Sequence, residues 1–277
     1  MTYEATLRKM FQGVDLKVED FYLLEKFQIS YLPDRVPQRE FAAVLWANAS
    51  IKRFLITKHP PIADFIEDVL ARHGPASDQQ ELAAHSDKLV WEIADQFMYV
   101  KHPGVYDQQT SYDLDFDEVT SIVPLENKTI IDAGAGTGLV AFAAAQTAGL
   151  VFAVDPVTSL RRFMRAKAAK IGATNLYVID GFLHAIPLPD KFADVLITSR
   201  AIGWQLEDEL REIERVVKAG GYAIHLSGPA SDTEDSPLHA CLTSPQWQYT
   251  YSRYEDKDGW KSKYWKQLSG FTRDESS

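Results

Sequence analysis

Hydrophobic residues after Pro124 gather in five short, nearly continuous runs, and amphipathic segments lie between them. Such runs, with few charges except at their ends, are typical of strands buried on both faces of a sheet. The predicted strands cover residues 128–132, 150–155, 175–180, 193–198 and 221–226, and the predicted helices cover residues 138–147, 159–171 and 206–218. This alternation predicts an α/β fold with a doubly wound, mostly parallel sheet, in which ligands bind at the carboxyl ends of the strands.

The first 125 residues show a different pattern, in which hydrophobic positions recur at the spacing of a helix face. Proline and glycine residues divide this part of the chain into separate segments. The predicted helices cover residues 38 to about 57 after Pro37 and residues 62–70 between Pro60-Pro61 and Gly74-Pro75. A third helix begins with a capping box of Ser77 and Gln80 and is stopped by His102-Pro103-Gly104, and a fourth covers residues 116–123 with Asp115 as the cap. This part of the chain is therefore expected to be helical.

Composition narrows the class of protein. The chain has 277 residues, of which 45% are hydrophobic and 25% charged, as in ordinary folded proteins. No apolar run approaches the roughly 20 residues of a membrane-spanning helix, and no signal peptide is visible at the N-terminus. Cys241 is the one cysteine, so the chain has no intrachain disulfide and no cysteine cluster for a metal. We therefore expect a cytoplasmic protein with no membrane partner.

Charge is distributed unevenly along the chain. The formal net charge is −10, and residues 1–125 contribute −8 of it, with 12 basic and 20 acidic groups. Residues 126–277 hold 17 basic and 19 acidic groups and are nearly neutral. An acidic surface repels phosphate backbones, so nucleic acid is an unlikely partner and a polyanionic ligand the least expected one.

A glycine-rich loop follows the first predicted strand, with the sequence Asp132-Ala-Gly-Ala-Gly-Thr-Gly138. Alternate glycines let the backbone turn tightly and approach a ligand closely. The dinucleotide fingerprint would need glycine at position 139, which is Leu139, and a phosphate-binding P-loop would need Gly-Lys-Ser/Thr. The spacing disfavours both, and a glycine-rich connector without a ligand is the other interpretation.

Acidic residues also close the second and third predicted strands. Asp155 is placed to accept hydrogen bonds from two ribose hydroxyls, and Pro156 could pack on an adenine face. Asp180 could accept a hydrogen bond from an exocyclic amine, followed by Gly181 and by the ring or amide of Phe182. A helix cap for Asp155 and an Asp-Gly turn at Asp180 are the structural alternatives.

Four segments together resemble the class I S-adenosylmethionine-dependent methyltransferases, in their small-molecule-like branch. They are DAGAGTG at 132–138, FAVDP at 152–156, VIDGFLHAIPLPDKFADVLI at 178–197 and EIERVVKAGGYAI at 212–224. The resemblance covers roughly residues 105–230 and implies a Rossmann-like, seven-stranded sheet whose last two strands are antiparallel. It also implies S-adenosyl-L-methionine as cofactor and S-adenosyl-L-homocysteine as product.

The resemblance assigns roles to individual positions of the predicted cofactor site. Asp132 and the loop backbone would hold the methionine moiety, Asp155 the ribose, and Asp180 the adenine amine. The full set of cofactor-binding candidates is Tyr106, Asp132, Gly134, Ala135, Gly136, Gly138, Asp155, Pro156, Asp180, Gly181, Phe182 and Ser199. Of these, Ser199 would lie near the sulfonium, and Tyr106 resembles residues that close over the cofactor.

Few residues are expected to take part in the chemistry itself. An activated methyl donor needs a base only if the acceptor must lose a proton, so positioning can supply much of the rate. His184 and His225 could each act as a base or be structural, and Arg200 could hold an anionic acceptor or bridge to a carboxylate. We take His184 and Arg200 as catalytic candidates and expect no metal. The sequence after the fourth strand lacks the Pro-Pro and Pro-Cys motifs of nucleic-acid base methylation.

The segments near the two ends of the chain are the parts of the sequence that bear on the identity of the substrate. Residues 247–268 form an aromatic hairpin with interspersed basic residues, which could stack on nucleic acid or could be the last two antiparallel strands, as we favour. Residues 1–104 are predicted as a helical cap or lid, and residues 105–277 as the cofactor-binding domain. The predicted function is in-line methyl transfer to a small or medium-sized molecule. The alternative functions are an NAD-type oxidoreductase or a cofactor-binding protein without turnover. The sequence does not decide between a monomer and a homodimer.

Overall fold

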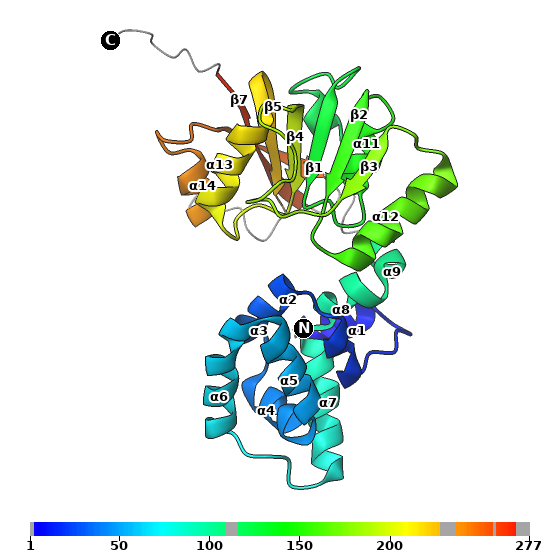
Figure 1. The fold of residues 1–277 in the computed structure, drawn as a ribbon, viewed down its shortest axis with the longest axis vertical. Helices are drawn as coiled ribbons and strands as arrows, with labels where there is room; N and C mark the ends of the chain where they lie inside the picture. The colour runs from blue at the N-terminus through cyan, green and yellow to red at the C-terminus, as the bar shows by residue number, and fades with distance from the viewer. Residues whose placement is uncertain (1–2, 109–115, 228–235, 257–258, 270–277) are drawn as a thin grey trace. The chain divides into compact units, whose positions relative to one another are not determined.

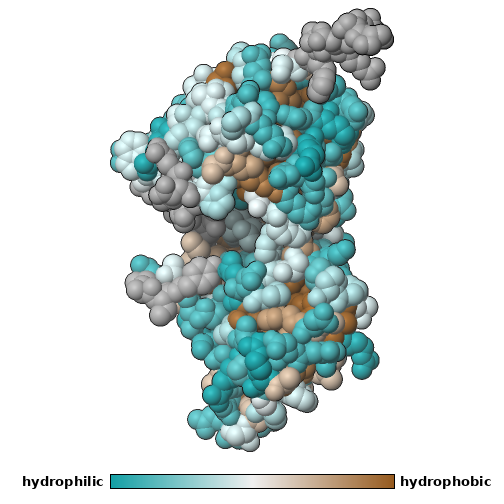
Figure 2. Space-filling model, turned by 90° about the vertical axis from the view of Figure 1, so that its left-hand side faces the viewer, coloured by the Kyte–Doolittle hydropathy of each residue, from teal (hydrophilic) through white to brown (hydrophobic). Residues whose placement is uncertain are grey.

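The computed structural model describes residues 3–108, 116–227, 236–256 and 259–269. The chain divides into two compact units, Met1–Gln109 and Thr110–Ser277, which are described separately below (Figure 1). Among the described residues, no helix is both long and apolar enough to cross a membrane. On the face drawn in Figure 2, hydrophilic side chains predominate and hydrophobic ones form small patches.

The first unit is entirely helical in its described part. Its core is a cluster of aromatic and aliphatic side chains in which Phe21 and Phe97 meet edge to face at 5.2 Å between ring centroids. The helices are α1 (Tyr3–Met10), η1 (Val18–Leu23), α2 (Lys26–Ser30), α3 (Leu32–Arg35), α4 (Gln38–Ala47), α5 (Ala49–Lys58), η2 (Pro60–Ile62), α6 (Ala63–Arg72), α7 (Gln79–Glu92), α8 (Ala94–Lys101) and α9 (Pro103–Asp107). The helical character predicted for this part of the chain is therefore confirmed.

Two of the predicted helices are each divided in the structure. The helix predicted from residue 38 to about residue 57 is broken at Asn48, between α4 and α5. The Asn48 side chain donates a hydrogen bond back to the carbonyl of Val44 at 2.9 Å, which is the local bonding that makes asparagine a poor helix-interior residue. The helix predicted to run from Ser77 to the stop at His102 ends where predicted but is broken at Ile93, where the backbone leaves the helical region at ψ 23°.

Capping residues also differ from the prediction. The cap of α7 is Asp78, one residue after the predicted Ser77, and its carboxylate accepts a hydrogen bond from the Glu81 amide at 2.8 Å. Glu81 in turn accepts hydrogen bonds from the amide and hydroxyl of Ser77, the residue before the cap. The helix predicted over residues 116–123 is α10 (Asp117–Thr120), capped by Phe116, and the predicted cap Asp115 lies outside the described residues.

The second unit is built on a seven-stranded sheet with the strand order β3-β2-β1-β4-β5-β7-β6. The strands from β1 to β5 pair in parallel, and β7 is antiparallel to both β5 and β6. The strands are β1 (Thr129–Ala133), β2 (Leu150–Val154), β3 (Leu176–Ile179), β4 (Ala193–Ser199), β5 (Val217–Ser227), β6 (Thr250–Asp256) and β7 (Gly259–Gln267). The doubly wound, mostly parallel sheet is confirmed, and its switch point lies between β1 and β4.

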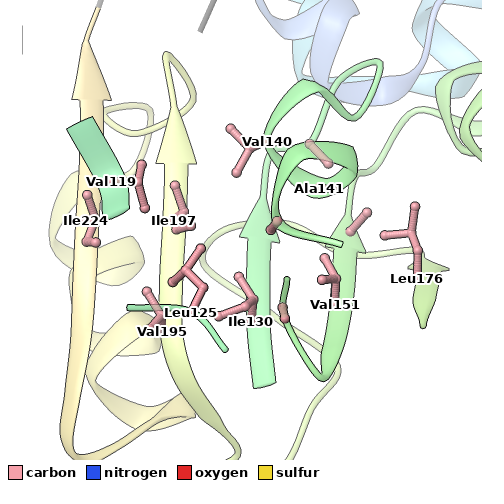
Figure 3. Packing of buried hydrophobic residues seen from close by; sticks show 14 of the residues in the cluster. Val119, Leu125, Ile130, Val140, Ala141, Val151, Leu176, Val195, Ile197 and Ile224 are labelled. Atoms are coloured by element: carbon pink, nitrogen blue, oxygen red, sulfur yellow. The ribbon is translucent and has the colours of Figure 1, made fainter. Parts of the chain in front are cut away.

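Helices cover both faces of the sheet. Successive residues point to opposite faces, so Ile130 belongs to one core and Ile131 to the other. On the first face, Val140 and Ala141 of α11 (Leu139–Ala144) and Val119 of α10 belong to the same buried cluster as Ile130 (Figure 3). Met164 and Ala168 of α12 (Thr158–Ile171) complete this face. On the second face, α13 (Leu206–Val216) and α14 (Pro237–Leu242) pack over the sheet.

Two boundaries in the second unit correct the prediction. The helix expected to extend to residue 218 ends at Val216, and β5 begins at Val217. A register shift along β4 between Ala193 and Val195 accommodates the extra residues at the start of β5. Residues 237–242, for which the sequence pattern predicted no helix, form α14 (Pro237–Leu242), with Ser236 as its N-cap.

The aromatic hairpin is the antiparallel edge of the sheet, as favoured from the sequence. Tyr264 of β7 is buried against the second core. Basic residues of β7 pair with acids on the covering helices: Lys263 lies 2.5 Å from a carboxylate oxygen of Glu118, and Lys266 lies 2.7 Å from Glu214. These lysines therefore take part in packing within the unit.

Candidate functional site

The glycine-rich loop connects β1 to α11 and is anchored to the neighbouring strand. The amides of Gly134 and Ala135 both donate to the carbonyl of Val154, at 2.9 and 3.0 Å. Gly138 donates to the Ala135 carbonyl at 2.7 Å and is the N-cap of α11. The loop is therefore tied to the carboxyl end of β2 at its start and to the first turn of α11 at its end.

The three glycines of the loop meet different surroundings. A Cβ at Gly134 would lie 2.3 Å from the Cβ of Ala201, and one at Gly138 would lie 2.9 Å from the ring of Phe142. Gly136, at φ +58°, has no atom within 4 Å of the position that a Cβ would take. Packing inside the protein thus requires glycine at the first and third positions. Gly136 is the position where open space borders the backbone and a ligand could approach it closely.

Asp132 is buried beneath the loop. One carboxylate oxygen accepts a hydrogen bond at 2.9 Å from the amide of Ala141, the third residue of α11. Burial raises the pKa of Asp132 to about 7, the hydrogen bond from Ala141 opposes this, and the charge of Asp155 adds to it. The structure shows this carboxylate bound to the first turn of α11, and its contact with a methionine moiety stays a prediction.

Asp155 lies at the carboxyl end of β2, and its side chain holds the loop closed. Its two oxygens accept hydrogen bonds from the amides of Gly136 and Val157, each at 2.8 Å, and the residue is only 4% exposed. Burial raises the pKa of Asp155 to about 6, against the opposing effect of these two amides. Each carboxylate oxygen can accept more than one hydrogen bond, so the arrangement leaves acceptor capacity for a hydroxyl.

Arg161 connects the two strand-end acids, and the sequence reasoning missed it. Its guanidinium donates to the backbone carbonyl of Asp155 at 2.8 Å and pairs with the carboxylate of Asp180 at 2.9 Å. Arg161 is buried, whereas the Asp180 side chain is 69% exposed. A basic residue in the first turn of the helix after Asp155 was the available signal, although helix surfaces commonly carry such residues.

An aromatic group lies beyond β3. Phe182 and His184 stack with their ring centroids 5.2 Å apart, and Trp204 contacts both, at 6.3 and 6.1 Å. Trp204 was not predicted, because it lies in the segment after β4 and no local motif marks it. Gly181 is required by packing, since a Cβ there would lie 2.7 Å from Pro187. The predicted candidates Phe182 and His184 are thus brought together, with Trp204 added.

Ser199 and Arg200 lie where β4 ends. Ser199 is the last residue of β4, and Arg200 is exposed with a left-handed backbone at φ +55°. The Arg200 amide donates to the carbonyl of Leu226 in β5 at 2.8 Å. The next residue, Ala201, packs against Gly134, so the segment after β4 borders the glycine-rich loop.

Two other candidates lie elsewhere. His225 is inside β5, fully buried, with its Nδ1 2.9 Å from the hydroxyl of Thr198, and burial lowers its pKa to about 3. These properties favour the structural interpretation of His225. Tyr106 belongs to α9 in the first unit, where its hydroxyl lies 2.9 Å from that of Tyr99. Its closing over a cofactor stays a prediction. Within the described parts of the chain, no three acidic, histidine or cysteine residues could together hold a metal ion.

A comparison with known protein families finds a match in the central part of the second unit. Residues 131–225 match a family model described as a methyltransferase domain. Similar solved structures include an S-adenosylmethionine-dependent methyltransferase from Aquifex aeolicus, which is 19% identical over 55% of this chain and 88% of that one, with a TM-score of 0.46. The YcgJ protein of Bacillus subtilis is 18% identical over 50% and 70%, with a TM-score of 0.45. The PH0226 protein of Pyrococcus horikoshii is 15% identical over 54% and 86%, with a TM-score of 0.44.

The two glycines should differ sharply in their tolerance of alanine. Gly134 and Gly136 both have positive φ, so alanine strains the backbone at either position by about 1 kcal/mol. Gly134→Ala adds the collision with Ala201 and should lower the free energy of unfolding by roughly 2–4 kcal/mol in total. Gly136→Ala should lower the free energy of unfolding only by the cost of this backbone strain. Urea unfolding of the two variants measures the difference, and equal losses would contradict this account of the loop.

The buried carboxylates should make stability depend on pH. The pKa values of Asp132 and Asp155 are raised from 3.8 to about 7 and about 6, so the folded state binds more protons than the unfolded state between pH 4 and 7. The free energy of unfolding should therefore fall as pH rises through this range. In Asp132→Asn the side chain is neutral at every pH and can still accept the hydrogen bond from Ala141. The variant should therefore reduce the decrease in the free energy of unfolding by up to roughly 2–4 kcal/mol.

Thermal and urea unfolding from pH 4 to 8 measure this dependence. Asp208→Asn, an exposed carboxylate on α13, is the matched control and should keep the wild-type slope. A wild-type slope in Asp132→Asn as well would show that Asp132 is already ionised at low pH in the folded protein.

Proposed function

We propose that this chain, whose residues 131–225 match a methyltransferase domain, is a class I S-adenosylmethionine-dependent methyltransferase that methylates a small or medium-sized acceptor by in-line displacement. One observation carries the proposal. At the switch point of the sheet, the backbone of Gly136 borders open space directly beside the carboxylate of Asp155. A ligand with a ribose and a charged amino-acid end is the kind of molecule that a glycine-rich loop and a strand-end acid together accommodate.

The cofactor is S-adenosylmethionine, and the residues of the site fit it. The loop backbone around Gly136 would hold its methionine end, and the acceptor capacity left on Asp155 would take the ribose hydroxyls. Asp180, with Gly181 and Phe182, would border the adenine. Arg161 supports this arrangement, because it keeps the ends of β2 and β3 in register through Asp155 and Asp180.

The residues of this chain would act mainly by positioning. When bound, the cofactor supplies a methyl group on a sulfonium, so the acceptor gains the methyl as the carbon–sulfur bond breaks and S-adenosylhomocysteine leaves. Ser199, at the end of β4, would lie beside the sulfonium. His184 would accept a proton from an acceptor that must lose one, and Arg200 would orient an anionic group. Holding two bound partners in line can supply several orders of magnitude of rate.

We further propose that the helices of residues 1–104 cap the acceptor site and determine which molecules enter. Residues 1–104 hold 15 acidic and 12 basic groups, and this net negative charge supports a neutral or cationic acceptor over a polyanionic one. The pairing of Lys263 and Lys266 with Glu118 and Glu214 supports the same choice, because it engages these lysines within the protein. The single Cys241 supports a cytoplasmic location.

The cofactor assignment can be tested directly by ligand binding. The wild-type protein should be stabilised against heat by S-adenosylmethionine and S-adenosylhomocysteine and not by NAD. Asp155→Ala should weaken S-adenosylhomocysteine binding by roughly 10- to 100-fold in calorimetry, because it removes the ribose acceptor and releases Gly136. Asp190→Ala, which removes an exposed carboxylate from the same unit, is the control. Stabilisation by NAD alone would reject the proposed function, and unchanged affinity in Asp155→Ala would reject the ribose role.

The cap can be tested through Tyr106, the cofactor candidate that lies in the first unit. If Tyr106 closes over the cofactor, Tyr106→Ala should weaken S-adenosylhomocysteine binding by roughly 10-fold, a loss of about 1.4 kcal/mol. Tyr22→Ala removes an exposed tyrosine from the same unit and should leave the affinity unchanged. Equal affinities for Tyr106→Ala and wild type would remove Tyr106 from the site and leave the test of Asp155 unaffected.

A further inference from the structure

Glu209 is a buried carboxylate that none of the cofactor assignments uses. It lies in α13 and is 1% exposed. One oxygen accepts a hydrogen bond from the amide of Gly203 at 2.7 Å, and the other accepts from the amide of Gln205 at 3.0 Å. A carboxylate is removed from water only when such partners replace its hydration. Glu209 therefore binds the backbone amides of the residues on both sides of Trp204.

The segment that Glu209 holds has a backbone that needs restraint. Arg200 has φ +55°, which is unusual for a residue with a side chain, and Gly203 has φ +123°. The amide of Arg200 is bonded to the carbonyl of Leu226 in β5, which secures the beginning of the segment. The two bonds to Glu209 secure its end. Between these two points, the chain can present only a narrow range of conformations.

The restrained segment borders the cofactor site at two places. Ala201 packs against Gly134 of the glycine-rich loop. Trp204, 38% exposed, contacts the rings of Phe182 and His184 in the segment after β3. The same short segment thus extends from the proposed methionine end of the site to the aromatic group beside the proposed adenine end.

Helix α13 holds the other half of the aromatic group as well. Glu212, one turn after Glu209, accepts a hydrogen bond at 2.6 Å from the amide of Ile186, close to His184 in the chain. Arg215 pairs with Glu212 and donates to the Ile186 carbonyl at 2.9 Å. Both segments that carry the aromatic rings are therefore bonded to carboxylates of one helix.

We propose that Glu209 is a positioning residue of the methyl-transfer site, which holds Trp204 against Phe182 and His184 as one wall of the cofactor pocket. This inference rests on the proposed function, and it adds a residue to which the sequence motifs give no role. Glu209 itself does not touch the ligand. It acts through two backbone amides, so its loss should change how the ligand is held more than whether the sheet folds.

The neighbouring residue Glu207 offers a matched control. Glu207 lies in the same turn of α13, but it is exposed and pairs with Arg211 on the helix surface. Glu207→Gln and Glu209→Gln make the same chemical change two residues apart. The buried glutamine can accept only through its carbonyl oxygen, so one of the two amides beside Trp204 loses its partner.

The test measures S-adenosylhomocysteine binding by calorimetry and the change in tryptophan emission that accompanies it. Glu209→Gln should bind roughly 10-fold more weakly and lose most of the emission change. Amide exchange at Gly203 and Gln205 should also become faster. Glu207→Gln should match wild type in all three measurements. If Glu209→Gln folds and matches wild type in affinity and emission, the proposal is overturned.

A second pair of variants keeps the test decisive if Glu209→Gln does not fold. Trp204 is partly exposed, so Trp204→Ala should fold and bind S-adenosylhomocysteine roughly 10-fold more weakly, whereas Trp204→Phe should keep most of the affinity. Wild-type affinity in Trp204→Ala would overturn the proposal. A wild-type protein that does not bind S-adenosylhomocysteine would instead reject the proposed function, and faster amide exchange in Glu209→Gln would still report the restraint of the segment.

Discussion

Two carboxylates that the fold removes from water determine how the carboxyl edge of the sheet is built. Asp132 and Asp155 end neighbouring strands, and each is almost completely buried. Burial without partners would cost several kcal/mol for each charge, so the backbone must supply amides to them. Asp132 takes the amide of Ala141 and so joins α11 to β1, while Asp155 takes the amides of Gly136 and Val157 and so joins the glycine-rich loop to β2. The path of the loop follows from these bonds.

Carboxylates also accept hydrogen bonds from backbone amides in the other loops at this edge of the sheet. Glu212 accepts from the amide of Ile186 in the connection between β3 and β4, and Glu209 accepts from the amides of Gly203 and Gln205 after β4. A carboxylate that accepts backbone hydrogen bonds holds a loop at a defined distance and restricts its conformations. The conformation of each loop beside the proposed cofactor pocket is therefore restrained by a side chain from another element.

Sequence patterns predicted the strands of the sheet, because buried parallel strands leave uninterrupted apolar runs. They also located the glycine-rich loop, Asp155 and Asp180, because each follows a strand directly. They could not separate the roles of Gly134 and Gly136, since that difference depends on Ala201, which lies far away in the sequence. Periodicity also could not show the break at Asn48, where a local side-chain bond competes with the helix. Trp204 was missed because its aromatic partners lie about 20 residues away in the sequence. Arg161 and Glu209 bind backbone atoms four to six residues away, but no motif distinguishes them from the other charged residues of α12 and α13.

Rigid positioning suits a reaction whose methyl donor is already activated. When the donor needs no further activation, the protein gains rate chiefly by holding two partners in line, and a loop that moves by a fraction of an ångström loses part of that gain. A site of this kind needs few titrating side chains, but it needs loops that stay in place. Asp155, Glu209 and Glu212 meet this need, since each exchanges its hydration for backbone amides of a loop at the switch-point edge. We therefore regard the buried acids of the second unit as residues that would position the reactants of the proposed methyl transfer.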